Sequence, residues 1–223
     1  TMESITVLIG LDGWKRLEKL RDPSAQLPGD EDVVAAESDV AVLIRAGLVI
    51  TCVPRPGDPV GRLAGAAVAI RGEHIVAVGP ESEIAAVFDL SAARIRTVPT
   101  VAPGVVDCHT HRIFGGSRVR EYAARMTHSA TEVAQIGIPT GIQASIAMTR
   151  AESTEQLVDS AAARLWSMLR HGTTTAEIKS GYGLTVQDEL RMLRAARSLP
   201  GLVPADVVTT FLGAHDFPPD MPR

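Results

Sequence analysis

The chain has 223 residues, a formal net charge of −4 and 45% hydrophobic residues, which is enough for a sizeable core. Its sequence has no basic block that would indicate a nucleic-acid surface, and no run of 18 apolar residues that would span a membrane. Two cysteines cannot form a disulfide framework, and no secretory signal pattern is recognisable, so we expect a cytoplasmic protein.

The N-terminal part of the chain divides into an extension and a β-rich region. Residues 1–37 differ in pattern from the rest of the chain, and we interpret them as an N-terminal extension of unknown role. In residues 38–98, short apolar runs alternate with turn residues, and Arg71-Gly72-Glu73 separates two such runs as a hairpin loop would. We therefore expect residues 38–98 to form an antiparallel sheet in a small β domain.

From residue 99 the pattern changes to an alternation of strands and helices, which predicts an α/β fold with a parallel sheet. One apolar run ends at His109, and further strands are expected at 173–178 and 207–212. Polar residues follow each of these runs, as they do at the catalytic rim of a (β/α)8 barrel. Residues 99–223 are therefore predicted to be the first βα units of such a barrel.

The segments between these strands carry helix signals of different strength. Ser153 is followed three residues later by Gln156, which predicts a capping box at the start of a helix. Thr185 is expected to begin another helix. Residues 112–150 contain scattered glycines and a proline, and we interpret them as a long loop with short helices, which in α/β enzymes often carries binding residues.

Two histidines follow the run Pro103-Gly104-Val105-Val106-Asp107 and are separated by one residue. In a strand, residues i and i+2 point to the same face, so His109 and His111 can present two imidazoles to one metal ion. Two solvated histidines are the alternative interpretation, but their position at the end of a buried strand favours a metal. Cys108 alternates to the opposite face, where we expect a buried thiol.

Four short motifs occur in order along the chain. Residues 109–118 read HTHRIFGGSR, residues 149–153 read TRAES, residues 177–184 read EIKSGYGL and residues 210–215 read TFLGAH. They resemble the HTH-x-x-FGG-x-R, TR-x-x-S, EIKSGYGL and TFLGAH motifs of the imidazolonepropionase family, which belongs to the amidohydrolase superfamily. Four such motifs in order and at sensible spacing are very hard to obtain by chance. The resemblance covers roughly residues 38–223.

The resemblance implies a fold and an activity. The fold would be an α/β, amidohydrolase-type (β/α)8 metal-dependent hydrolase barrel with a small N-terminal β-sandwich domain, to which residues 38–98 contribute the N-terminal part. Imidazolonepropionases hydrolyse the cyclic amide of 4-imidazolone-5-propanoate to N-formimidoyl-L-glutamate in histidine degradation. A bound metal would polarise the carbonyl and lower the pKa of its water, so that hydroxide can attack at neutral pH.

The resemblance also assigns roles to particular residues. His109 and His111 would bind one divalent or trivalent metal ion, zinc or iron. Arg118, Tyr182 and His215 would bind the substrate. A guanidinium can hold the propanoate carboxylate through two hydrogen bonds, a phenol can donate one more, and an imidazole can protonate the polar edge of the ring. His215 is thus a candidate acid or base, while the catalytic group proper is left unassigned.

Each of these residues has a simpler interpretation. Arg118 would otherwise be a solvated surface charge, Tyr182 a packing residue of its loop, and His215 a structural residue at a strand end. Glu177 and Lys179 share a strand face, and we favour an ion pair between them over a catalytic role. His128 and His171 have no motif support and are interpreted as surface or helix-end residues.

Two features separate this chain from the family pattern. Residues 126–131 replace a segment that usually contains an aromatic residue, and residues 136–141 replace a glycine triplet. A related cyclic-amide or imidazole-ring hydrolase is therefore the first alternative function. Three strands also fall short of a barrel, which takes about 250 residues. We expect the chain to be an incomplete portion, inactive alone, and the second alternative is a non-catalytic truncated protein that pairs with a partner.

These expectations imply few partners. An enzyme of this kind requires a small-molecule substrate, and neither a nucleic acid nor a membrane is expected to bind. The sequence leaves a homo-oligomer open and does not distinguish zinc from iron, since imidazole suits several first-row metals.

Overall fold

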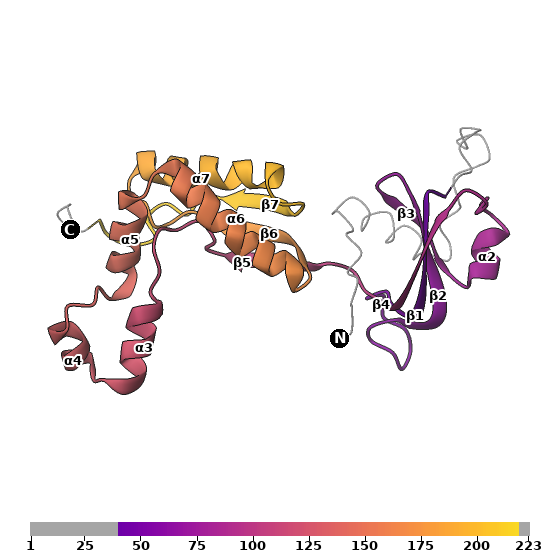
Figure 1. Cartoon of the computed structure of the whole chain (residues 1–223), viewed down its shortest axis with the longest axis horizontal. Helices are drawn as coiled ribbons and strands as arrows, with labels where there is room; N and C mark the ends of the chain where they lie inside the picture. The colour runs from indigo at the N-terminus through magenta and orange to yellow at the C-terminus, as the bar shows by residue number, and fades with distance from the viewer. Residues whose placement is uncertain (1–39, 219–223) are drawn as a thin grey trace. The chain divides into compact units, whose positions relative to one another are not determined.

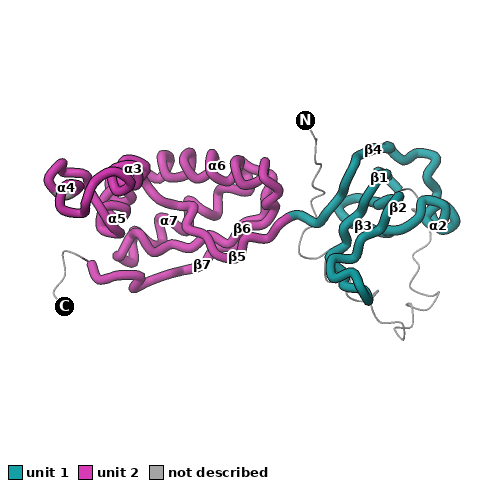
Figure 2. The backbone as a smooth tube through the Cα atoms, turned by 90° about the horizontal axis from the view of Figure 1, so that it is seen from below, with its two compact units in different colours: residues 1–104 teal, residues 105–223 magenta. Residues whose placement is uncertain are grey.

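The computed structural model describes residues 40–218, whose contacts divide into two compact units. The first unit extends to Gly104 and the second begins at Val105 (Figure 2). The proposed extension, residues 1–37, lies outside the described residues. Each unit has its own hydrophobic core.

The first unit is built on one four-stranded sheet with strand order β3-β2-β1-β4. The hairpin expected around residues 71–73 is confirmed, because β2 and β3 pair antiparallel on either side of Gly72. The expectation of a purely antiparallel sheet is wrong, because β4 pairs with β1 in parallel, with Val42 opposite Arg94. The elements are β1 (Val42–Ile50), β2 (Arg62–Arg71), β3 (His74–Gly79), α2 (Glu81–Ala85) and β4 (Arg94–Val101).

Both faces of this sheet bury apolar side chains. Leu43 and Ile44 are neighbours on β1, and because side chains alternate along a strand they enter two different clusters. Leu43 packs with Ile84 of α2, whereas Ile44 packs with Val98 of β4. The strands of this region are continuous apolar runs because side chains on both faces of the sheet are buried.

The second unit contains a three-stranded parallel sheet with strand order β5-β6-β7. The connection from β5 to β6 passes through α3 to α6, and the connection from β6 to β7 passes through α7 and a short 3-10 helix (Figure 1). The parallel α/β arrangement predicted from the sequence is thus confirmed for these three strands. They are β5 (Val105–Thr110), β6 (Thr173–Lys179) and β7 (Asp206–Thr210).

Two long helices supply the core of the second unit. In α6 (Thr154–Arg170), Leu157, Ala161 and Leu165 recur on one face and are fully buried against Ile178 of β6. The predicted capping box is confirmed, since the Ser153 hydroxyl accepts a hydrogen bond from the Gln156 amide and the Gln156 side chain accepts one from the Ser153 amide. In α7 (Val186–Ser198), the predicted N-cap Thr185 accepts a hydrogen bond from the Asp188 amide.

The segment after β5 forms helices that extend beyond the sheet (Figure 1). They are α3 (Val119–Thr127), α4 (Ala130–Gln135) and α5 (Gly141–Ala151). We expected a long loop with short helices here, and α5 is longer than that expectation allows. Its buried residues Ala144, Ser145, Ile146 and Thr149 lie at helical spacing. By contrast, most residues between Arg125 and Thr140 are exposed.

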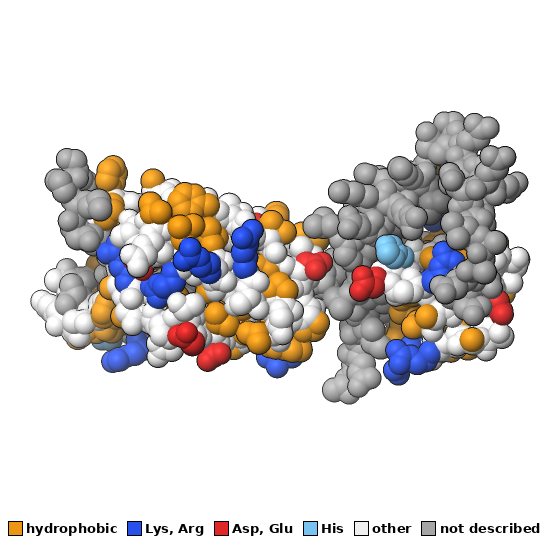
Figure 3. Space-filling view, turned by 90° about the horizontal axis from the view of Figure 1, so that it is seen from above, with side chains coloured by type: hydrophobic (Ala, Val, Ile, Leu, Met, Phe, Trp, Pro, Cys, Tyr) orange, Lys and Arg blue, Asp and Glu red, His pale blue; other side chains and the backbone are white. Residues whose placement is uncertain are grey.

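The surface of the second unit is chemically mixed. Figure 3 shows hydrophobic side chains interspersed with Lys and Arg side chains on the face that it presents. On α3, Val119, Tyr122 and Met126 are large hydrophobic residues with about two thirds of their surface exposed. Within residues 40–218, none of the helices combines the length and the apolar character that a membrane span requires.

Leu165 provides a test of the α6 core. Its side chain is 0% exposed, so Leu165→Ala should lower the free energy of unfolding by about 2–5 kcal/mol through lost burial and a residual cavity. Urea unfolding followed by Trp166 fluorescence, in a Trp14→Phe background, measures this change. The control Leu190→Ala, at a position 40% exposed, should cost less than about 1 kcal/mol. Equal losses in both variants would contradict the packing described.

Candidate functional site

Three aromatic side chains from three different strand ends meet at the carboxyl edge of the parallel sheet. His111 follows β5, Tyr182 follows β6 and His215 follows β7. The His111 and His215 rings are stacked with centroids 5.1 Å apart, and Tyr182 lies 5.0 Å from His111 and 5.7 Å from His215. The sequence predicts that His109, Tyr182 and His215 lie near one rim, and this is confirmed, because the His109 ring lies 6.1 Å from that of His111 in the same cluster.

His109 and His111 lie at and just beyond the end of β5, with ring centroids 6.1 Å apart. His109 is exposed, whereas Nδ1 of His111 is buried and finds no hydrogen-bond partner among the described residues. Burial lowers the pKa of His111, and the charges of His215, His109 and Lys179 lower it further. The lowered pKa favours the neutral ring, which is the form that binds metal ions.

His109 and His111 are not joined by a third metal-binding side chain among the described residues. Residues 40–218 contain no group of three or more His, Cys, Asp and Glu side chains placed to hold one ion. The separation of 6.1 Å still allows both rings to reach one ion, because zinc–nitrogen distances are about 2.0–2.1 Å. A pair of this kind would need further ligands for a full coordination shell.

The orientation of His215 is fixed by a backbone carbonyl. Its Nδ1 lies 3.0 Å from the oxygen of Gly181. A carbonyl only accepts, so Nδ1 carries the hydrogen and Nε2 of the neutral ring is left as an acceptor. Gly181 adopts φ +116, and a Cβ there would lie 2.8 Å from Nδ1 of His215, so this contact requires glycine.

The loop that carries Tyr182 is held by a buried carboxylate. Glu189 of α7 is 2% exposed and accepts hydrogen bonds from the amides of Gly181, Gly183 and Leu184 at 2.5–2.8 Å. Arg150 also donates to the Gly183 carbonyl at 2.7 Å. These contacts give the loop a fixed path without using the Tyr182 side chain.

Glu177 and Lys179 form an ion pair on β6, as their spacing predicts. Burial by itself would raise the pKa of Glu177, but hydrogen bonds from Lys179, Thr210 and the Thr110 amide together hold this pKa below its ordinary value. The Thr110 hydroxyl also donates to the Glu177 carbonyl at 2.7 Å. Glu177 thus joins β6 to Thr110 of β5 and to Thr210 of β7, close to the histidine cluster.

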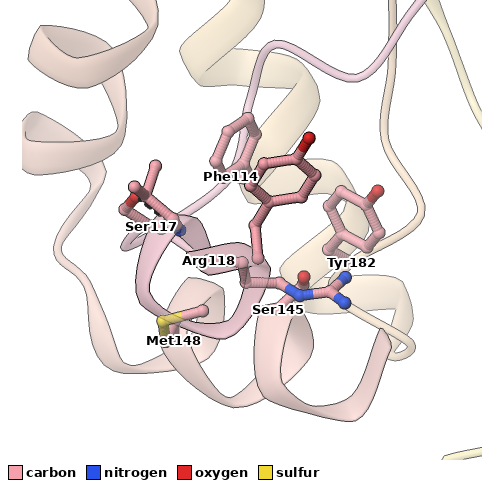
Figure 4. A pocket seen from close by; sticks show the side chains of 9 residues that line it. Phe114, Ser117, Arg118, Ser145, Met148 and Tyr182 are labelled. Carbon is pink, nitrogen blue, oxygen red and sulfur yellow. Dashed lines mark hydrogen bonds between the residues drawn. The ribbon is translucent and has the colours of Figure 1, made fainter. Parts of the chain in front are cut away.

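A pocket of about 390 Å³ opens beside Tyr182 (Figure 4). Aromatic and apolar side chains form much of its wall, and Arg118 supplies a positive charge. Arg118 and Tyr182 were predicted as substrate-binding residues, and the structure places both on this pocket, whereas His215 contacts Tyr182 but does not line the pocket. The full lining is Phe114, Gly115, Ser117, Arg118, Val119, Tyr122, Ser145, Met148 and Tyr182.

Arg118 is held from behind by a buried carboxylate. Its Nε lies 2.5 Å from Oε2 of Glu121, which is 3% exposed, whereas the Arg118 side chain is 41% exposed. Oε1 of Glu121 accepts from Arg125 at 2.9 Å and from the Gly141 amide at 3.3 Å. The hydrogen bond from Arg118, with help from the Gly141 amide and the positive charges, lowers the pKa of Glu121 to about 2.

The glycine pair of the HTHRIFGGSR motif packs directly against α5. The Gly115 amide donates to the Thr149 hydroxyl at 3.0 Å, and a Cβ on Gly115 would lie 2.4 Å from the Met148 carbonyl oxygen. Arg164 of α6 lies over the Phe114 ring at 3.6 Å and donates to carbonyls of the same loop, among them that of Phe114 at 2.9 Å. This packing positions the pocket wall formed by Phe114 and Gly115.

Several residues that build the site were missed by the sequence analysis. Glu121, Glu189 and Arg164 lie in none of the four motifs, and Thr149 lies in one but was assigned no role. They act through backbone amides, backbone carbonyls or, for Glu121, also through two guanidinium groups. For Glu121 a signal did exist, because Arg118 and Arg125 lie three and four residues away on one helical face. That signal can be used only once residues 119–127 are recognised as a helix.

The prediction for Cys108 was wrong, and those for two other histidines were right. Cys108 is exposed rather than buried, because the burial pattern of β5 leaves most of this edge strand accessible. His128 and His171 are exposed and form the C-caps of α3 and α6, as expected for helix-end residues.

Comparisons with known proteins find close sequence relatives. An imidazolonepropionase of Rhizobium meliloti (strain 1021) is 43% identical over 170 residues, which are 73% of this chain and 39% of that protein. An imidazolonepropionase of Erwinia tasmaniensis is 46% identical over 165 residues, 72% of this chain and 39% of that protein. The chain thus spans about two fifths of the length of the curated relatives it matches. No family model matches the chain.

Solved structures are more distant. A crystal structure of an amidohydrolase aligns with a TM-score of 0.46 at 18% identity, over 76% of this chain and 31% of that one.

The Glu121 cluster predicts how stability depends on acid. A carboxyl whose pKa folding lowers from 4.5 to about 2 stabilises the protein above pH 4.5, and this contribution is lost as the pH falls towards 2. The melting temperature should therefore drop over this range, and the drop should be smaller in Glu121→Gln, which has no charge to lose. Thermal melts by circular dichroism at successive pH values measure the difference. If the melting temperature fell equally with pH in wild-type protein and in Glu121→Gln, Glu121 would not be the source of this acid dependence.

Proposed function

Because the chain is related to the imidazolonepropionase family, we propose that it is a portion of a metal-dependent hydrolase that opens the cyclic amide of 4-imidazolone-5-propanoate to N-formimidoyl-L-glutamate. The observation that carries the proposal is the juxtaposition of the histidine cluster and the pocket, with Tyr182 in both. The histidine cluster offers imidazole rings, and the pocket offers the guanidinium of Arg118. A ring with a short carboxylate arm matches both.

In this proposal Arg118 and Tyr182 bind the carboxylate arm. Arg118 contacts Glu121 through Nε, so its terminal nitrogens can form a two-pronged contact with a carboxylate. Tyr182 can add a hydrogen bond from its hydroxyl. The aromatic and apolar wall around them favours a flat organic ligand over a free inorganic anion.

His215 acts on the ring end. With Nδ1 donating to the Gly181 carbonyl, Nε2 is the atom that can accept or return a proton. The stacked His111 ring, 5.1 Å away, keeps the His215 imidazole in one plane. His215 is therefore our candidate for the group that binds or protonates the polar edge of the substrate ring.

His109 and His111 are the proposed metal ligands. Neutral imidazole, the unpartnered Nδ1 of His111 and the spacing of the two rings fit a divalent ion such as zinc or ferrous iron. Such an ion, when bound, supplies Lewis acidity that polarises a carbonyl and lowers the pKa of a water. The remaining ligands would come from residues other than those described.

We also propose how the chain is divided. Residues 38–98 would be the N-terminal part of a composite β-sandwich and residues 99–223 the first βα units of a barrel, while residues 1–37 form an extension. The sheet of β1 to β4 and the parallel units β5 to β7 support this division. We further propose that the enzyme is cytoplasmic and acts on a small molecule, with a homo-oligomer left open.

A related cyclic amide is the second candidate substrate. Residues 126–131 and 136–141 differ from the family pattern, and both segments adjoin α3, which contributes Val119 and Tyr122 to the pocket wall. A change in this wall would alter which ring fits, while leaving the carboxylate contact of Arg118 in place.

A chimera tests the proposed activity. The Rhizobium meliloti relative, with its aligned segment replaced by the matching residues of this chain, should convert 4-imidazolone-5-propanoate to N-formimidoyl-L-glutamate, as detected by chromatography. In this chimera Arg118→Ala should lower kcat/KM about tenfold to a hundredfold, since it removes a charged hydrogen-bonded contact, and should leave metal content unchanged.

The matched control is Arg120→Gln, which removes an exposed arginine of the same helix and should leave kcat/KM unchanged. A folded, metal-loaded chimera that forms no product would overturn the proposed activity. Product formation that survives Arg118→Ala undiminished would instead remove only the carboxylate-binding role.

The metal ligands are tested on the chain itself. In zinc titrations by calorimetry, His111→Asn should raise the dissociation constant at least about tenfold, or about 1.4 kcal/mol, because it removes one of two imidazoles. His128→Asn, which changes an exposed histidine at the C-cap of α3, should leave zinc binding unchanged. Equal losses in the two variants would identify non-specific binding and exclude the assigned pair.

A further inference from the structure

Glu121 is a buried carboxylate shared by three donors. It is 3% exposed and lies in the first turn of α3. One oxygen accepts from Arg118 Nε at 2.5 Å, and the other accepts from Arg125 Nε at 2.9 Å and from the Gly141 amide at 3.3 Å. Because Gly141 is the first residue of α5, the same carboxylate joins α3 to α5.

This arrangement leaves one edge of the Arg118 guanidinium free. Glu121 engages Nε, and the described residues provide no hydrogen bond to the terminal nitrogens of Arg118. Figure 4 shows the guanidinium extending towards Tyr182, with the side chains of the pocket around it. The terminal nitrogens are therefore presented to the pocket, where a carboxylate could bind them as a pair.

The geometry points to Glu121 as a positioning residue that holds the Arg118 guanidinium in the orientation that binds the carboxylate of the ligand. This inference rests on the proposed function, since it requires a carboxylate in the pocket, and it adds a residue to which that function assigned no role. Glu121 itself does not line the pocket. It acts by removing the rotational freedom of Arg118, whose side chain is otherwise 41% exposed.

Two features argue against a merely structural ion pair. Arg125 already provides Glu121 with a charged partner, so neutralising the carboxylate does not by itself require Arg118. The two arginines and one carboxylate also leave one positive charge in excess, and of the two arginines only Arg118 lines the pocket. The link to α5 further couples Arg118 to the helix that carries Ser145 and Met148 of the pocket wall.

The inference is tested by binding to the whole chain with two matched probes, 3-(imidazol-4-yl)propanoate and its primary amide. Wild-type protein should bind the carboxylate at least about tenfold more tightly than the amide. Glu121→Gln should reduce this preference roughly threefold to tenfold, mainly by weakening the binding of the carboxylate probe. Glu121→Asp, which keeps the charge but withdraws it from Arg118, should reduce the preference in the same direction.

Arg125→Gln is the matched control, because it removes the other ion pair to the same carboxylate and should keep the preference. Arg118→Ala should abolish the preference, and adding Glu121→Gln to it should change nothing further. A preference that persists in folded Glu121→Gln and Glu121→Asp would overturn the inference. Equal weakening of both probes would also overturn it, because a general structural effect would then suffice.

A ligand-free measurement separates this inference from the proposed function. The Nε–H nuclear magnetic resonance signal of Arg118, assigned with Arg118→Lys, should be sharp in wild-type protein and broadened or lost in Glu121→Gln. If wild-type protein shows no carboxylate preference, the role of Arg118 in the proposed function fails and the positioning role fails with it. If the preference exists but the signal is unchanged in Glu121→Gln, the positioning role alone is wrong.

Discussion

The parallel pairing of β5, β6 and β7 is the constraint on which the site depends. Since the three strands run in the same direction, their carboxyl ends lie at one edge of the sheet. The loops after them can then bring His111, Tyr182 and His215 within ring contact although they are far apart in sequence. Had one strand been antiparallel, its loop would lie at the opposite edge and the cluster could not form.

Backbone groups, more than side-chain pairs, fix the loops at this edge. Glu189 binds the amides of the Tyr182 loop, Thr149 binds the Gly115 amide, and Arg164 binds carbonyls of the loop after β5. Backbone donors and acceptors have defined directions, so such contacts restrict a loop path strongly. They also explain why the sequence motifs contain glycine and threonine next to the residues that face the pocket.

Local features of the fold could be predicted from the sequence. The capping box of Ser153 and Gln156 and the β2–β3 hairpin depend on residues close in the chain, and both were found. The parallel pairing of β4 with β1 was missed, because nothing within a short window specifies a distant strand partner. The prediction that Cys108 is buried failed for a related reason. Its exposure depends on what covers β5, and not on the alternation of side chains along the strand.

The candidate site divides in the same way. Arg118, Tyr182 and His215 belong to motifs and could be named from the sequence, and the structure brings them to one region. Glu121 and Glu189 could not, because their partners include amides of Gly141 and Gly181 that only the fold brings close. The roles of the named residues stay predictions that the proposed binding and activity measurements address.

The glycine at position 115 gives the two walls of the pocket different freedom to evolve. A side chain there would meet the Met148 carbonyl at 2.4 Å, so this wall changes only if α5 moves. Another part of the wall is formed by Val119 and Tyr122 of α3, which are largely exposed, so substitutions there cost little stability. Selection for a new ligand can therefore act on one wall while the other keeps the loop and its neighbouring histidines in place.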